Sequence, residues 1–193
     1  MRIHRILEVS NANGPGSRFV VWVQGCSRNC PGCFNPQTHD PCAGYELEVS
    51  EIIQQIPLAK VGGITVSGGE PFEQAEELLE LLEETGRKGL NRLVYSGYTY
   101  EELLAQKSCA YKKCLSEIDI LIDGAYEKEN PPLMPWTGSG NQRLIQLHCG
   151  RIKKIYKKKD IETAAAVAPN GEIIIDKNGG IITTGIFDSR IFL

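Results

Sequence analysis

The sequence lacks long apolar runs. Nowhere do roughly 18 consecutive apolar residues occur, and residues 1–9 contain no apolar core of signal-peptide length. It also lacks a strong charge of either sign, because 21 basic residues stand against 24 acidic ones, for a net charge of −3. Such a balance gives no general attraction to nucleic acid or to an anionic membrane surface. We therefore expect a cytoplasmic protein with no nucleic-acid or membrane partner.

The chain is also too short for two large domains. Its 193 residues, 41% of them hydrophobic, fit one well-packed domain with a small appendage. Cysteine is present in an odd number, seven, and three of the seven lie close together. This distribution argues against a secreted disulfide framework and favours a reducing compartment.

Cys26, Cys30 and Cys33 are the most informative residues of the chain, with the spacing CxxxCxxC. Three thiolates suit a four-cornered iron–sulfur cube in which one iron is left free to bind substrate or cofactor. The alternative is a structural zinc site, since cysteine pairs with two to four intervening residues are common in such sites. A fourth zinc ligand would come from Cys42, Cys109, Cys114 or Cys149.

Apolar, β-branched runs alternate with segments of helical period, which predicts an α/β fold built from βα units. Strands are predicted near residues 3–9, 18–24, 61–67, 91–96, 118–123 and 143–148. Helices are predicted from Ser50 to about Ile56, from Pro71 to just before Gly86 with Ala75, Leu78, Leu79 and Leu82 inward, and after the capping box at Thr99 with Leu103 and Leu104 inward. Six strands predict a partial (βα)6 barrel, because the chain is too short for eight units.

The composition changes near Arg151. A basic run follows, expected to be a linker or a solvated helix face, and it comprises Lys153, Lys154, Lys157, Lys158 and Lys159. Residues 163–187 then contain two Asn-Gly turns between short apolar runs, which predicts a small C-terminal β-meander. We therefore expect a barrel domain over residues 1–150, and a basic linker with the meander over 151–193.

A second motif, Gly68-Gly69-Glu70, follows the third predicted strand. Two glycines let backbone amides approach a ligand closely, and a carboxylate can hold a cationic group. Alone, such a motif is more often a simple strand-to-helix turn.

Together these motifs resemble the radical S-adenosylmethionine (SAM) superfamily, whose signature is CxxxCxxC. The segments 14–18, Gly-Pro-Gly-Ser-Arg, and 34–36, Phe-Asn-Pro, resemble the small activases of glycyl radical enzymes. The segments 93–103, 118–124 and 138–143 most resemble the activating proteins of anaerobic, class III ribonucleotide reductase. With the cysteine loop they cover nearly all of residues 12–149 in the family's order.

The resemblance implies a radical SAM oxidoreductase with a [4Fe–4S] cluster and SAM as cofactors. It implies that SAM is cleaved reductively to a 5′-deoxyadenosyl radical, which removes a hydrogen atom from a glycine of a large glycyl radical enzyme. That partner would be anaerobic ribonucleoside-triphosphate reductase, and the electron would come from a flavodoxin- or ferredoxin-type donor.

The resemblance also implies roles for individual residues. Gly68, Gly69 and Glu70 would hold the methionyl ammonium group of SAM, and Phe34 would lie against the adenine. Three residues at or near strand ends would lie close to the SAM carboxylate, the ribose or the same pocket, namely Ser96, Asp123 and Arg143. Judged from the residues alone, the four remaining cysteines, His39 and His148 are expected to be structural, with a place at the mouth of the site as the alternative for His39.

Residues 151–193 depart from the reductase activases, which end soon after the Asn-Gln-Arg strand. This departure keeps open a small radical SAM enzyme that modifies a peptide or metabolite directly, with the C-terminal segment as a recognition element. From another class, a non-catalytic zinc protein also stays open.

Overall fold

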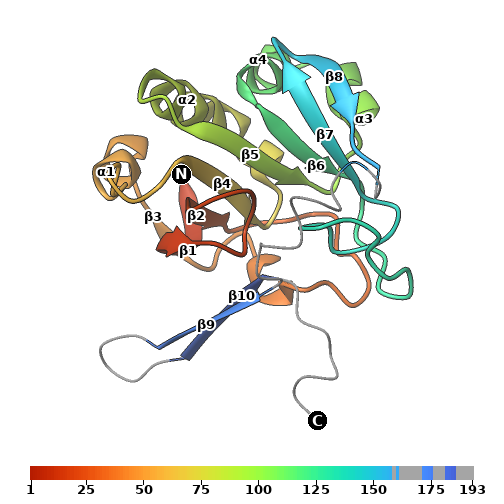
Figure 1. The fold of residues 1–193 in the computed structure, drawn as a ribbon, viewed down its shortest axis with the longest axis horizontal. Coiled ribbons are helices and arrows are strands. Elements are labelled where there is room, and N and C mark those ends of the chain that lie inside the picture. Colours follow the sequence, from red (N-terminus) through yellow and green to blue (C-terminus); the bar gives the residue numbers. More distant parts are fainter. Residues whose placement is uncertain (158–159, 161–170, 176–180, 186–193) are drawn as a thin grey trace.

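An eight-stranded mixed sheet organises most of the chain (Figure 1). The computed structural model describes residues 1–157, 160, 171–175 and 181–185. The strand order is β3-β1-β2-β4-β5-β6-β7-β8. These strands are β1 Arg2–Ser10, β2 Arg18–Val23, β3 Tyr45–Glu46, β4 Gly63–Gly68, β5 Asn91–Ser96, β6 Ile120–Asp123, β7 Arg143–His148 and β8 Arg151–Ile155.

The sheet confirms the α/β class and all six predicted strands, but it does not confirm six βα units in a partial barrel. Strands β2, β4, β5 and β6 are parallel, whereas β1 and β7 run antiparallel to their neighbours. The strand directions differ because of the segments that connect the strands. A parallel pair needs a long crossover, which a helix provides, whereas residues 11–17 and 124–142 contain no helix and return the chain antiparallel.

Helices α1 to α4 lie along one side of the sheet (Figure 1). The predicted capping box at Thr99 is confirmed at the start of α3. Helix α1 instead begins after Glu48, because Glu48 and Glu51 form a capping box there. The helices are η1 Pro36–Thr38, α1 Val49–Gln54, η2 Pro71–Gln74, α2 Ala75–Arg87, α3 Tyr100–Ala105 and α4 Cys109–Glu117.

The main hydrophobic core lies between these helices and the sheet. Because side chains alternate across a strand, every second residue of a central strand reaches this core, as Phe19, Val21 and Val23 of β2 do. The opposite face carries a smaller cluster around Leu93 and Ile122. The expected inward position of Leu104 is wrong, since its side chain is exposed while Leu103 is fully buried.

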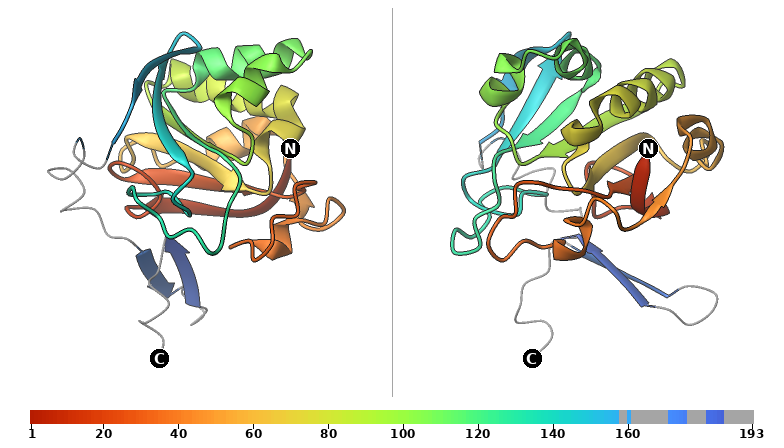
Figure 2. Two further views of the ribbon diagram at one scale, coloured as in Figure 1. Left: turned by 90° about the vertical axis from the view of Figure 1, so that its right-hand side faces the viewer. Right: turned by 180° about the vertical axis from the view of Figure 1, so that it is seen from behind.

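The C-terminal part forms a hairpin apart from the main sheet, from β9 Gly171–Ile175 and β10 Ile181–Gly185. Both views of Figure 2 show it on the side of the molecule away from helices α1 to α4. It supplies two strands of the expected meander, and the third, near residues 164–168, lies outside the described residues. The start of the basic run is an edge strand, β8, rather than a helix face or linker.

No helix in the described part of the chain is long and apolar enough to cross a membrane.

Candidate active site

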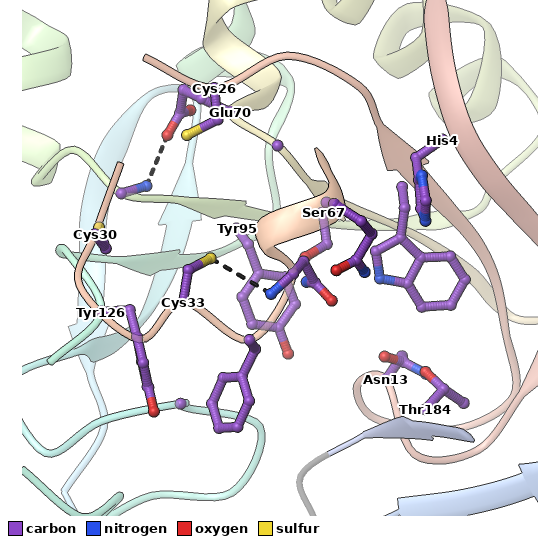
Figure 3. A pocket seen from close by; sticks show the side chains of 18 of the residues that line it. His4, Asn13, Cys26, Cys30, Cys33, Ser67, Glu70, Tyr95, Tyr126 and Thr184 are labelled. Atoms are coloured by element: carbon purple, nitrogen blue, oxygen red, sulfur yellow. Dashed lines mark hydrogen bonds between the residues drawn. The ribbon is translucent and has the colours of Figure 1, made fainter. Parts of the chain in front are cut away.

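A cavity of about 540 Å³ lies at the carboxyl ends of the parallel strands (Figure 3). The loops that follow β2, β4, β5 and β6 all contribute to its wall, as expected for ligand sites in parallel sheets. Eight of the ten predicted site residues line it, namely Cys26, Cys30, Cys33, Phe34, Gly68, Gly69, Glu70 and Ser96.

The three cysteines belong to one loop between β2 and η1. The base of the loop is closed by two backbone hydrogen bonds, from Gly25 N to Thr38 O at 2.8 Å and from Cys26 N to His39 O at 3.2 Å. All three thiols are free and partly buried. Burial raises the pKa values of Cys26 and Cys33, although the Asn35 N–H bonded to the Cys33 sulfur opposes that shift. A cationic metal centre would offset this cost of ionisation.

The donor set, three free thiols on one short loop, has the chemistry that an iron–sulfur cube requires. In the part of the chain that the structure describes, no three His, Cys, Asp or Glu side chains converge closely enough to hold one metal ion. A cube takes one thiolate on each of three irons, so its ligands need to surround a space rather than meet at a point. Figure 3 shows the three cysteines along one side of the cavity, with Glu70 beside Cys26.

Gly68 and Gly69 are required by the close approach of two chain segments. A Cβ on Gly68 would lie 2.6 Å from both Val23 N and Val23 O, and a Cβ on Gly69 would collide with the carbonyl oxygen of Gly25. The amides of Gly69 and Glu70 donate to Val23 O and Gly25 O at 2.8 and 2.9 Å. The glycines therefore fix the end of β4 against the start of the cysteine loop.

Glu70 is a buried carboxylate at the cavity wall. It accepts hydrogen bonds from Gly97 N at 2.8 Å, Phe72 N at 3.1 Å and the Ser96 hydroxyl at 3.0 Å. Burial raises its pKa to about 7, although these three hydrogen bonds oppose the shift. A ligand cation next to Glu70 would therefore favour the ionised form.

Ser96 orients Glu70. Its hydroxyl donates to Glu70 and accepts from Tyr98 N at 3.1 Å. Because a hydroxyl has one proton, Ser96 has none left for a ligand in this arrangement.

Phe34 lies at the cavity, and the residue is 54% exposed. Its ring centroid is 4.6 Å from that of Tyr126, a cavity residue that the sequence reasoning missed. The two rings present an aromatic surface suited to a planar base.

Asp123 and Arg143 are not among the residues that line the cavity. They form an ion pair with each other, Arg143 also pairs with Glu101, and Asp123 accepts from Tyr100 N at 2.7 Å. Asp123 is two residues after Leu121, whose side chain belongs to the helix-side core. Side-chain alternation therefore directs Asp123 toward the start of α3.

The alternation of side chains along a strand also places two residues in the cavity that the sequence did not predict there. Trp22 and Tyr95 follow core residues of β2 and β5 by one position, so they point to the opposite face and line the cavity. The Tyr95 hydroxyl donates to Trp136 O at 2.9 Å. The C-terminal segment was expected as a recognition element and not as part of the cofactor site, yet all five residues of β10 line the same cavity.

Arg18 has a structural role within its motif. Its buried guanidinium donates to Thr65 Oγ1 at 2.7 Å, to Ile64 O at 2.6 Å and to Asn91 O at 2.8 Å. It also donates to Pro15 O at 3.1 Å, which ties the loop before β2 to β4 and β5. Desolvation lowers the pKa of Arg18 to about 10, so it stays charged at neutral pH.

The remaining cysteines do not gather into a second centre. Cys114 is buried, its thiol donates to Ala75 O, and burial raises its pKa to about 12. Cys42, Cys109 and Cys149 are exposed, so the expected packing role applies to Cys114 alone. His39 lines the cavity, which was the alternative to its expected structural role.

Comparison with known proteins shows which family the chain resembles. A family model described as a 4Fe-4S single cluster domain matches residues 12–145. The anaerobic ribonucleoside-triphosphate reductase-activating proteins of Enterobacteria phage T4 and Salmonella typhi are 31% and 32% identical to this chain. These matches cover 75% and 76% of this chain and 93% and 99% of the relatives. The pyruvate formate-lyase-activating enzyme of Clostridium pasteurianum is 36% identical over 113 residues, 53% of this chain and 48% of that enzyme.

These matches confirm the resemblance to radical SAM activases and the expected cofactors, a [4Fe–4S] cluster and SAM. They leave no support for the zinc alternative. The family model ends at residue 145, so the β9–β10 hairpin lies beyond it. Because that model spans most of the chain and the reductase-activating relatives match along almost their whole length, this chain belongs to the radical SAM, 4Fe-4S single-cluster family of glycyl-radical-enzyme activases.

Proposed function

We propose that this chain cleaves SAM reductively and generates a glycyl radical on a partner enzyme. The observation that carries the proposal is the meeting of the cysteine loop, Glu70 and an aromatic pair at one cavity. When bound, the cluster and SAM supply one electron and the 5′-deoxyadenosyl radical that takes a hydrogen atom from a glycine Cα.

The chain's own residues bind and orient these groups. Cys26, Cys30 and Cys33 would hold the cluster, which leaves the fourth iron open. Glu70 would accept the methionyl ammonium group, because it is a buried carboxylate held by three donors. Phe34 and Tyr126 would hold the adenine against the surface that their rings form together.

Asp123 and Arg143 would support the SAM site without contacting SAM. Their ion pair fixes the end of β6 against β7, and Asp123 also holds the first turn of α3. Gly124, the next residue, does line the cavity. We therefore infer that this pair positions the cavity wall rather than touching SAM.

The partner would be a large glycyl radical enzyme, an anaerobic ribonucleoside-triphosphate reductase, as the names of the T4 and Salmonella relatives suggest. An enzyme of the pyruvate formate-lyase type is the second candidate, favoured by the 36% identity to its activating enzyme. We propose a flavodoxin- or ferredoxin-type electron donor and a cytoplasmic setting.

The experiment combines anaerobically reconstituted protein with SAM, a reductant and each purified candidate partner. We expect a glycyl-radical EPR doublet on one partner and one 5′-deoxyadenosine released for each radical formed. Release of 5′-deoxyadenosine with neither partner activated would favour direct modification of a peptide or metabolite. Reduced protein that never releases 5′-deoxyadenosine would refute the radical reaction itself.

A further inference from the structure

Arg28 lies between the first two cluster cysteines and lines the cavity, yet no motif assigned it a role. Its guanidinium carbon is 4.5 Å from the centroid of the Tyr98 ring, which is a cation–π contact. Its side chain crosses Gly97 so closely that a Cβ there would meet Arg28 Nε at 2.7 Å. The Tyr98 ring and the Gly97 backbone therefore hold the Arg28 side chain in place.

The guanidinium group of Arg28 has N–H donors that form no hydrogen bond with the described residues. Arg28 Nε is buried and has no hydrogen-bond partner in the described structure. None of the ion pairs among the described residues includes Arg28. The two terminal NH2 groups of Arg28 are not among the buried atoms and form no hydrogen bond or ion pair with the described residues, so they are the donors that a ligand in the cavity can meet.

The surrounding carboxylates are already engaged. Glu70 accepts from Gly97 N, Phe72 N and Ser96, and Glu102 accepts from the amide and hydroxyl of Thr99. Neither carboxylate forms an ion pair with Arg28, so the guanidinium is available to an acceptor on the ligand.

Gly97 connects the two charged groups of the wall. Its amide donates to Glu70 at 2.8 Å, and its Cα lies under the Arg28 side chain. An anion and a cation thus flank one backbone position. The ammonium and carboxylate groups of an α-amino acid are attached to a single carbon and need such a pair of partners at short range.

We propose that Arg28 binds the carboxylate of SAM while Glu70 binds its ammonium group. The assignment rests on the proposed function, since it requires SAM in this cavity. Ser96 does not bind the SAM carboxylate in this arrangement, because its single hydroxyl proton is donated to Glu70.

The test compares two ligands, SAM and decarboxylated SAM, on the full chain with an oxidised cluster, so that no turnover occurs. Equilibrium dialysis under anoxia measures both dissociation constants. We expect Arg28→Gln to weaken SAM by roughly 10- to 100-fold and to leave decarboxylated SAM unchanged within about twofold. Arg28→Lys keeps the charge without the planar fork and should lie between wild type and Arg28→Gln.

The matched control is Arg151→Gln, which changes an exposed arginine of β8 that does not line the cavity. It should leave both dissociation constants unchanged, and iron content should stay the same in every variant. Equal weakening of both ligands by Arg28→Gln, or no weakening, would overturn the assignment while SAM binding by the wild type upholds the cofactor site. A shift of cluster reduction potential with unchanged SAM affinity would assign Arg28 to the cluster instead. Wild-type protein that binds neither ligand would overturn both proposals.

Discussion

The Asn13 side-chain amide donates a 2.8 Å hydrogen bond to Thr184 Oγ1, across 171 positions of sequence. Both residues are buried. Ser10 at the end of β1 and Asn11 in the loop that follows donate to the Glu172 carboxylate. Asn13 immediately precedes the Gly-Pro-Gly-Ser-Arg segment of residues 14–18, whereas Thr184 lies beyond the region that the family model matches. An element outside the matched region is thus attached directly to the wall of the active cavity.

Removing the hairpin should separate cofactor chemistry from radical transfer. A chain that ends at Lys159 is expected to keep its cluster and uncoupled SAM cleavage, because all three cysteines and Glu70 lie in the main domain. Transfer to the partner glycine should be lost, since β10 forms part of the cavity wall. The glycyl-radical EPR doublet measures transfer, and an undiminished doublet would contradict this prediction. Loss of soluble protein would show that the hairpin belongs to the core.

The cluster ligands can be tested by iron content. Replacing Cys26, Cys30 and Cys33 together by Ala should abolish the brown colour and the roughly four irons per reconstituted chain. The control is the exposed residue Cys109, whose change to Ala should leave the iron content unchanged. A triple variant with full iron would refute the assignment, and a Cys109→Ala variant with half the iron would reveal a second cluster.

Glu70 can be tested by SAM affinity. Glu70→Ala should weaken binding by about 1.5–3 kcal/mol, because it removes a charge-assisted partner for the ammonium group. Equilibrium dialysis with oxidised protein measures the change. Glu76→Gln on the exposed side of α2 is the control and should have no effect. Unchanged affinity in Glu70→Ala would exclude Glu70 from the SAM site.

Gly69 tests the packing between β4 and the cysteine loop. Gly69→Ala places a Cβ against the carbonyl oxygen of Gly25, so the loop must shift. We expect a loss of about 1–3 kcal/mol in the free energy of unfolding, as for overpacked sites, together with a lower cluster yield. Gly62→Ala is the matched control, because a Cβ there meets nothing within 4 Å. Urea unfolding and iron analysis would contradict the prediction if both glycine variants behaved alike.

Arg18 is expected to matter for stability more than for chemistry. Arg18→Met leaves four oxygen acceptors without their donor, three of them backbone carbonyls of residues 15, 64 and 91. Urea unfolding should show a loss of about 3 kcal/mol or more. Arg87→Met, which removes only exposed ion pairs of α2, should cost less than about 1 kcal/mol. Similar losses of unfolding free energy in the two variants would contradict the structural role assigned to Arg18.

The sequence by itself determined the local features of this protein. Cysteine spacing within eight residues already specified three ligands on one loop, because neighbouring residues cannot separate far in space. The strand positions and the capping box at Thr99 were also local, since they depend on side-chain period and on a hydrogen bond across three residues.

Only the tertiary structure decided which side chains share the cavity. Asp123 and Arg143 are at strand ends, as predicted, but strand alternation turns them toward α3 and each other. Arg28 gained a role only once Tyr98 and Gly97, from a separate loop, were placed beside it. The hairpin reaches the cavity through contacts such as Asn13 to Thr184, and no local pattern encodes a contact over that separation. Long-range packing and strand direction made these choices, because they depend on how distant segments bury their surfaces together.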